Sequence, residues 1–298
     1  MNNERFGVHI CTRNRNSYLA SLLLSLHQQT IQNWDVVIVD DYSDRPVAQD
    51  KHCTDIIQFL RNNKHRVQLI TNPTRLLVCK SRNVAVMNDD HEICCRIDDD
   101  SYLEQDYLEK LWNAINVDNR IGAVGGIVPY LAQGVGDGKH TYGYARNTNK
   151  IEWFNHTTCD EKGENLAWDD MGHYHWFPEK IIQSHHLRSS YMFRKKAIEE
   201  VGGFEEWTGV TGFSEETVNC LKMLDKGWKL FTCTGAKAWH LVAVGDGRDL
   251  CGRDYKDLVE GNKRKAKKVL KPILASLHKK GILKSSDKVT RRGTIIEL

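Results

Sequence analysis

Short apolar runs alternate with amphipathic segments through the first hundred residues, and this alternation constrains the fold more than any other feature. The runs cover 8–12, 36–40, 67–71 and 92–97. Between them, apolar side chains recur with a period of 3.6 residues, most clearly in the segment that begins at Ser17. Strands that are apolar on both faces are typical of parallel sheets covered by helices on each side. The pattern therefore predicts an α/β fold of Rossmann type, with a mixed, mostly parallel sheet flanked by helices.

The second half of the chain continues this pattern less regularly. Further helices are expected over 56–60, 77–87, 103–117, 194–201 and 215–226, and further strands over 123–131 and 228–244. The stretch 134–170 is polar, aromatic and contains several glycines, so we expect long loops over a site there.

Composition excludes several classes of protein. Hydrophobic residues make up 40% of the 298 residues, which is enough for a sizeable core and excludes a disordered or collagen-like chain. No run of 18 apolar residues could span a membrane, and the polar N-terminus does not resemble a signal peptide. The nine cysteines include no C-x-x-C pair, which favours reduced thiols. Together these features predict a cytoplasmic protein.

The net charge of +3 hides a strong asymmetry. Residues 261–298 carry twelve Lys or Arg and two acids, a net charge of +10, which leaves −7 for the rest of the chain. We expect a basic helical tail that contacts an anionic membrane face, nucleic acid or an acidic polymer. Its apolar stripe of Val269, Leu270, Ile273, Leu274 and Leu277 could instead pack on the body. Pro272 interrupts this stripe, so a helix would begin near it or bend there.

Aspartates follow two of the predicted strands. Asp98, Asp99 and Asp100 end the fourth strand, and adjacent carboxylates repel one another unless a cation neutralises them. Carboxylate oxygens suit Mn²⁺ or Mg²⁺, usually with substrate phosphates in the coordination shell. Asp40 and Asp41 end the second strand, where they could form an ordinary turn or bind a base or ribose. The glycine-rich phosphate-binding loops of other nucleotide-binding folds do not follow these strands.

The order and spacing of several motifs resemble family 2 glycosyltransferases, which have the GT-A fold. The matching stretches are V-H-I-C-T-R-N-R near the start, V-V-I-V-D-D-Y-S-D at 36–44, K-S-R-N-V-A at 80–85, R-I-D-D-D-S-Y at 96–102, G-G-F-E-E at 202–206 and S-E-E-T-V-N-C-L at 214–221. The resemblance covers roughly residues 5–245. It implies metal-dependent transfer of a sugar from a nucleotide donor, most often a UDP-sugar, to an acceptor hydroxyl, with inversion at the anomeric carbon.

The resemblance also implies roles for individual residues. Cys11, Thr12 and Arg15 would line the nucleotide, and Asp41 would accept the uracil imide hydrogen. Arg82 would lie near the nucleotide or its diphosphate. Asp98 would face the ribose and the metal, Asp99 could assist, and Asp100 would bind the metal. The nucleotide-sugar half would span 1–101, the acceptor and catalytic half 102–250, and the basic extension 251–298.

Two further groups are candidates for catalysis. Glu215 and Glu216 stand where the family usually has Glu-Asp, and Glu216 aligns with the base that deprotonates the acceptor, although the choice between the two remains open. The same acids could simply favour a helix N-terminus with Ser214 as its N-cap. His240 in A-W-H-L-V resembles a late third metal ligand of several GT-A enzymes, and a neutral imidazole suits Mn²⁺.

The sequence leaves the acceptor open among a glycan, a lipid-linked sugar and nucleic acid, including hydroxylated DNA bases. A sugar-phosphate nucleotidyltransferase is disfavoured because C-T-R-N-R after the first strand contains no glycine. A non-catalytic nucleotide- or sugar-binding protein would keep the aspartates without needing a base. An aspartate-based metal nuclease would cleave nucleic acid without any nucleotide sugar.

Overall fold

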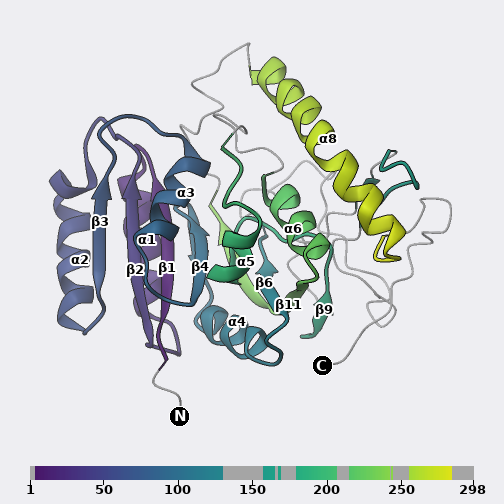
Figure 1. Cartoon of the computed structure of the whole chain (residues 1–298). Helices are drawn as coiled ribbons and strands as arrows, with labels where there is room; N and C mark the ends of the chain where they lie inside the picture. Colours follow the sequence, from purple (N-terminus) through teal and green to yellow (C-terminus); the bar gives the residue numbers. More distant parts are fainter. Residues whose placement is uncertain are drawn as a thin grey trace, which may run out of the picture.

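The computed structural model describes residues 4–129, 157–164, 167–168, 179–206, 215–241, 243 and 255–283. One nine-stranded sheet forms its centre, in the order β3-β2-β1-β4-β10-β6-β11-β5, with β9 paired to β11 (Figure 1). Its strands are β1 Phe6–Thr12, β2 Trp34–Asp40, β3 Val67–Thr71, β4 Ile93–Asp98, β5 Ser101–Leu103, β6 Ile121–Ile127, β9 Ile181–Gln183, β10 Tyr191–Arg194 and β11 Lys229–His240. A separate two-stranded sheet pairs β7 Thr157–Thr158 with β8 Ala167–Trp168.

Helices cover both faces of the main sheet. They are α1 Asn16–His27, α2 Lys51–Asn62, α3 Val78–Met87, α4 Tyr107–Ile115, α5 Lys195–Glu200, α6 Glu215–Asp225 and α8 Tyr255–Lys279, with a 3₁₀ turn at Val47–Gln49. The apolar faces of α1, α2 and α4 pack on one side of the sheet. The apolar faces of α5, α6 and α8 pack on the other side, with part of α3. This is the layered α/β arrangement that the alternating pattern predicted.

The first strands are parallel, so their carboxyl ends lie at one edge. β1 pairs in parallel with both β2 and β4, and β2 with β3. Side chains of β2 alternate between the two faces of the sheet: Val36 and Ile38 pack in the core with α1 and α2, whereas Val37 and Val39 pack with Ala85 of α3 on the other face. The chain enters β1 from the opposite edge, near the N-terminus in Figure 1. Polar groups that follow β1, β2 and β4 therefore meet at a single edge.

Three features of the fold differ from the sequence-based expectation. β10 lies between β4 and β6 and runs antiparallel to both, although its four residues were not predicted as a strand. The segment expected to be helical from residue 103 begins as the edge strand β5, and the helix itself covers only 107–115. The tail helix does not begin near Pro272, because α8 is one helix of 25 residues that contains this proline.

The apolar stripe of α8 packs on the body of the protein. Ala266, Leu270, Leu274 and Leu277 are buried in the same core as α6, and Figure 1 shows the two helices side by side. Ser276 donates a hydrogen bond of 2.7 Å to Asp225 at the end of α6. Within the described residues, no helix has the length and apolarity needed to cross a bilayer.

Candidate active site

Three potential metal ligands meet beyond the carboxyl end of β4. Ligand atoms of Asp98, Asp100 and His240 all lie within 4.8 Å of one another. His240 is the last residue of β11, and its Nε2 lies 3.5 Å from Oδ1 of Asp100. The backbone N–H of Ala243 donates to the other oxygen of the Asp100 carboxylate at 3.1 Å. Two carboxylates and an imidazole form a ligand set that suits Mn²⁺. Mg²⁺ also binds carboxylates but has less preference for the imidazole.

The middle aspartate points toward the end of β1. Asp99 accepts a hydrogen bond of 2.8 Å from the Thr12 hydroxyl and one of 2.9 Å from the Arg15 guanidinium. Arg15 also lies 3.5 Å from Asp100. Burial, together with the charge of Asp100, raises the pKa of Asp99 to about 6 despite the opposing effect of Arg15. Thr12 and Arg15 therefore hold the aspartate cluster together in this structure.

The aspartates after β2 organise the neighbouring loops. Asp40 is completely buried and accepts the backbone N–H groups of Ser43 and Val47, which is the turn role considered for it. Asp41 accepts the N–H groups of Leu76 and Leu77, just before α3, at 2.7 and 2.9 Å. Cys11 is partly exposed at the end of β1, and burial raises the pKa of its thiol to about 12.

Glu215 and Glu216 begin α6, and their environments differ sharply. The Glu215 side chain is 0% exposed and pairs with both Arg82 and Arg96, the latter at 2.6 Å. Glu216 is 24% exposed and, within the part of the chain that the structure describes, forms an ion pair with Arg96 at 3.5 Å. Residue 214, the expected N-cap, lies outside the described residues. Both acids suit the first turn, where the helix dipole favours negative charge.

Burial and charge set the protonation of these groups. Burial raises the pKa of Glu216 to about 7, and the neighbouring charge of Glu215 adds to this shift, whereas Arg96 and Arg82 oppose it. Burial also favours the protonated form of Asp98, but Arg82 and Arg96 outweigh it and lower the pKa of that carboxyl. Glu216 is therefore poised to exchange a proton near neutral pH, while Asp98 stays ionised.

The structure brings most of the predicted residues together but turns Arg82 inward. Its guanidinium donates to Asp98 at 2.8 Å and also contacts Glu215, so it bridges β4 and α6. Sequence reasoning missed Arg96, which lies in the middle of β4 and is 2% exposed. An arginine within an otherwise apolar strand requires buried carboxylate partners, and this signal could have identified it.

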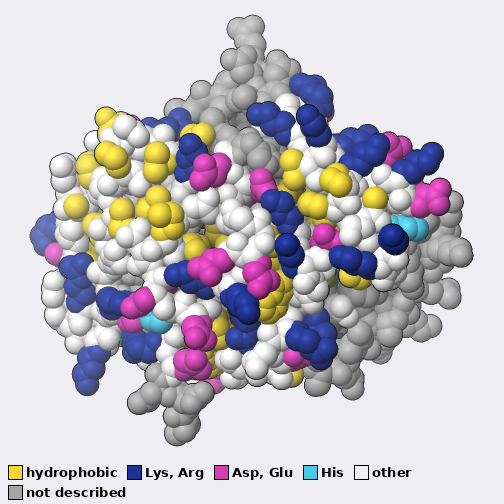
Figure 2. Space-filling view, in the orientation of Figure 1, with side chains coloured by type: hydrophobic (Ala, Val, Ile, Leu, Met, Phe, Trp, Pro, Cys, Tyr) yellow, Lys and Arg dark blue, Asp and Glu magenta, His cyan; other side chains and the backbone are white. Residues whose placement is uncertain are grey.

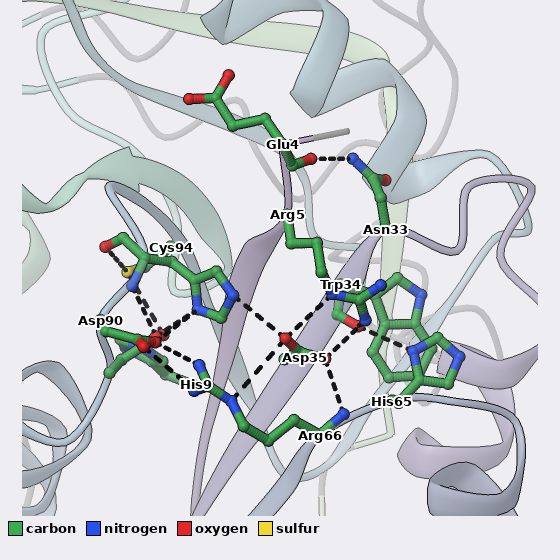
Figure 3. Close-up of polar contacts among 12 residues, drawn as sticks. Glu4, Arg5, His9, Asn33, Trp34, Asp35, His65, Arg66, Asp90 and Cys94 are labelled. Atoms are coloured by element: carbon green, nitrogen blue, oxygen red, sulfur yellow. Dashed lines mark hydrogen bonds and ion pairs between the residues drawn. The ribbon is translucent and has the colours of Figure 1, made fainter. Parts of the chain in front are cut away.

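A second polar cluster, not anticipated from the sequence, lies at the opposite edge of the sheet (Figure 3). We call it the amino-edge cluster: Arg5, His9, Asp35, Asp89 and His91. His91 lies 3.2 Å from Asp35 and 2.5 Å from Asp89, and His9 lies 2.6 Å from Asp89. Arg5 contacts Asp35 at 2.6 Å. The cluster is internally paired, and Asp35, Asp89 and His91 lie at or before the starts of β2 and β4, opposite the strand ends that form the candidate site.

The sheet and its flanking helices match the GT-A fold, with candidate acidic metal ligands after β4 and two glutamates at the start of α6. The model of the glycosyl transferase family 2 matches residues 7–185, so the chain belongs to this family. The search of curated proteins found no match.

Solved structures support the same fold. The chain is 18% identical to S. aureus TarS, with a TM-score of 0.52 over 80% of this chain and 37% of TarS. It is 12% identical to GalNAc-T7, solved with UDP, GalNAc and Mn²⁺, with a TM-score of 0.61 over 96% of this chain and 56% of that one. It is 16% identical to the mannosyltransferase PcManGT from Pyrobaculum calidifontis, solved with GDP-Man and Mn²⁺, with a TM-score of 0.57 over 91% and 68% of the two chains.

Proposed function

We propose that this protein is a metal-dependent glycosyltransferase that moves a sugar from a nucleotide donor to an acceptor hydroxyl, with inversion at the anomeric carbon. The observation that carries the proposal is the grouping of Asp98, Asp100 and His240, together with the partly exposed Glu216, which shares the cation Arg96 with Asp98. A UDP-sugar is the favoured donor, since structures of GalNAc-T7 and of TarS were solved with UDP. GDP-Man, found in PcManGT, is the alternative.

Asp98, Asp100 and His240 would hold Mn²⁺ or Mg²⁺. When bound, the cation would offset the negative charge that develops on the departing diphosphate. Thr12 and Arg15 would keep Asp99 fixed so that the neighbouring ligands stay in place. Asp41 would accept the uracil imide hydrogen, and Cys11 would lie beside the nucleotide. Arg82 would act near the nucleotide through its ion pair with Asp98.

Glu216 is the group we assign as the base. An acceptor hydroxyl attacks efficiently only when a base takes its proton, and the base must lie on the sugar face opposite the diphosphate. Glu215 is unsuited to this step because it is fully buried between two guanidiniums. Glu216 is accessible, and its pKa of about 7 lets it accept a proton at neutral pH.

We assign the donor half to residues 1–101, the acceptor half to 102–250 and the basic extension to 251–298. The basic face of α8 would contact an anionic partner such as a charged acceptor polymer, nucleic acid or a lipid-linked sugar at a membrane. Arg264, Lys265 and Lys268 are exposed, and no ion pair to them occurs within the described residues. Figure 2 shows Lys and Arg side chains over the region that α8 occupies. Because the apolar stripe is buried, this contact would be electrostatic rather than an insertion into lipid.

The experiment is a thermal-shift and calorimetric screen with UDP-, GDP-, CMP- and dTDP-sugars, with and without Mn²⁺. A ligand that binds only the folded state raises the melting temperature. We expect a shift with one nucleotide sugar that requires Mn²⁺ and disappears in Asp100→Ala. A folded protein that responds to none of the donors would overturn the proposal and favour a metal nuclease.

Glu216→Gln separates an enzyme from a non-catalytic binding protein. In the enzyme, the variant keeps nucleotide binding and loses turnover by about 10²–10⁴-fold. If the wild-type protein binds the donor but never releases UDP or transfers sugar to any acceptor, the binding-protein alternative is correct.

A further inference from the structure

Arg96 carries its charge into the interior of the protein, where a lone charge is strongly unfavourable. Its side chain is 2% exposed and projects from the fourth position of β4, a strand that is otherwise apolar until Asp98. A buried guanidinium is tolerated only when carboxylates and aromatic faces surround it. The surroundings of Arg96 therefore indicate what this residue does.

Three carboxylates and two aromatic rings surround the guanidinium. The ion-pair distances are 2.6 Å to Glu215, 3.5 Å to Glu216 and 3.9 Å to Asp98. The rings of Tyr191 and Phe204 lie with their centroids 5.0 and 5.2 Å from its central carbon. Within the described residues, its contacts with the carboxylates are ion pairs rather than aligned hydrogen bonds. Arg96 therefore acts mainly as a fixed positive charge between β4 and the start of α6.

The two glutamates use this charge in different ways. Glu215 is held by Arg82 and Arg96 together and is closed off from solvent. Among the described residues, Glu216 has only the longer contact with Arg96, and its side chain is partly open to solvent. A carboxylate that acts as a base needs a defined position, but a short ion pair would hinder it from accepting a proton. The contact at 3.5 Å meets both requirements.

We propose that Arg96 is a positioning residue that sets the place of the Glu216 carboxylate and joins it to the donor side of the site. The second link runs through Arg82, which contacts both Asp98 and Glu215. Arg96 touches neither donor nor acceptor; it acts through Glu216. This inference rests on the proposed function, in which Glu216 is the base.

The first test is Arg96→Lys, which keeps the charge but replaces the broad guanidinium by a single ammonium. UDP binding with Mn²⁺, measured by calorimetry, should stay within about twofold of wild type. Turnover is measured as UDP release from the UDP-sugar that the wild-type protein uses fastest. We expect kcat to fall about 10- to 100-fold while the KM for this sugar nucleotide stays unchanged, because small displacements of a reacting group have effects of this size. An unchanged kcat, or a loss of UDP binding equal to the loss of kcat, would overturn the proposal.

A second variant separates positioning from simple neutralisation of Glu215. The double variant Arg96→Met with Glu215→Gln removes the buried positive charge together with its closest carboxylate. Neither of these two groups is then left as an unpaired buried ion. If Arg96 only neutralises Glu215, this double variant should recover wild-type kcat. We expect kcat to stay as low as in Arg96→Lys while UDP binding persists.

Two controls complete the design. Arg194→Gln removes a half-buried arginine that donates to the carbonyl groups of Ile115 and Ile121, away from the site. It should lower the melting temperature without changing kcat. Glu216→Gln isolates the proposed function. If that variant keeps turnover, the base assignment is wrong; if it loses turnover while both Arg96 variants keep it, only the role of Arg96 is overturned.

Discussion

A carboxylate that acts as a base must be held in place and still be free to bind a proton, and Glu216 meets both demands. Burial and the neighbouring Glu215 raise its pKa to about 7, while Arg96 and Arg82 limit the shift. A carboxylic acid with this pKa is mostly protonated at pH 6 and mostly ionised at pH 8. Because only the ionised form accepts a proton, we expect kcat to fall about tenfold for each pH unit below 7 and to level off above it.

The measurement is kcat against pH between 5.5 and 8.5 at saturating donor and a fixed Mn²⁺ concentration. UDP binding over the same range serves as the control, because a change there would report on the donor site rather than on Glu216. A flat kcat profile between pH 6 and 8 would contradict the assignment of Glu216.

The three potential metal ligands give a second prediction at this scale. Asp100→Asn and His240→Gln should each raise the Mn²⁺ concentration needed for half-maximal UDP binding by at least about tenfold, since each removes a direct ligand. EDTA should abolish UDP binding to the wild-type protein. Asp118→Asn is a matched control, because Asp118 pairs with Arg120 and Lys229 far from the site. Equal Mn²⁺ requirements in all the variants would exclude these residues as ligands.

At the scale of single elements, the sequence predicted the helices and strands whose formation depends mainly on their own residues. The strands and helices up to residue 98 were identified from the spacing of their own apolar residues, although α2 was predicted only for 56–60 and covers 51–62. β10 was missed because its four residues, Y-M-F-R, are ordered by pairing with β4 and β6, which are distant in sequence. The inward turn of Arg82 and the surroundings of Arg96 were missed for the same reason, since both arginines also pair with glutamates on α6, which is distant in sequence.

The sequence left open whether the apolar stripe of the tail helix packs on the body of the protein or faces a partner, and the packing in the structure answers this question. Leu274 of α8 is buried against the core that contains α6, whereas Lys268 is exposed. Leu274→Ala should therefore lower the free energy of unfolding by about 2–5 kcal/mol. Lys268→Ala should change it by less than about 0.5 kcal/mol. Urea unfolding of both variants gives the comparison, and similar small effects would mean that α8 does not stabilise the body.

At the scale of the whole molecule, ionisable groups gather at both edges of the sheet with opposite consequences. At the carboxyl edge, three adjacent aspartates are only partly balanced by Arg82 and Arg15, and we expect a cation to offset the remaining negative charge. At the amino edge, each carboxylate of the amino-edge cluster already has cationic partners, and the cluster ties the start of β2 to the loop before β4. Gly7 is needed there, because a Cβ at this position would lie 1.6 Å from the Asp89 carboxylate. The amino edge therefore contributes to stability, and pH should control that contribution.

Hydrogen bonds to Asp35 and Asp89 raise the pKa of His91 to about 9, whereas the ordinary value is about 6.5. His91 therefore stabilises the fold fully below about pH 6.5, and this contribution is lost as the pH rises through 9. Burial opposes ionisation of Asp35 and Asp89, but hydrogen bonds from His91 and from Arg5 or His9 lower the pKa of both well below their usual range. Their contribution is present above about pH 4 and is lost on acidification.

The wild-type protein should consequently lose up to about 3 kcal/mol of unfolding free energy from His91 between pH 6 and pH 9.5. His91→Gln removes the titrating group, so its stability should change less over the same range and should fall below wild type mainly at pH 6. Urea unfolding at the two pH values measures both effects. If wild type and variant show the same pH dependence, His91 does not hold its proton through contact with Asp35 and Asp89. Because the amino-edge cluster lies away from the candidate site, UDP binding by His91→Gln at pH 7 should match wild type, which separates the stability of the fold from the chemistry at its opposite edge.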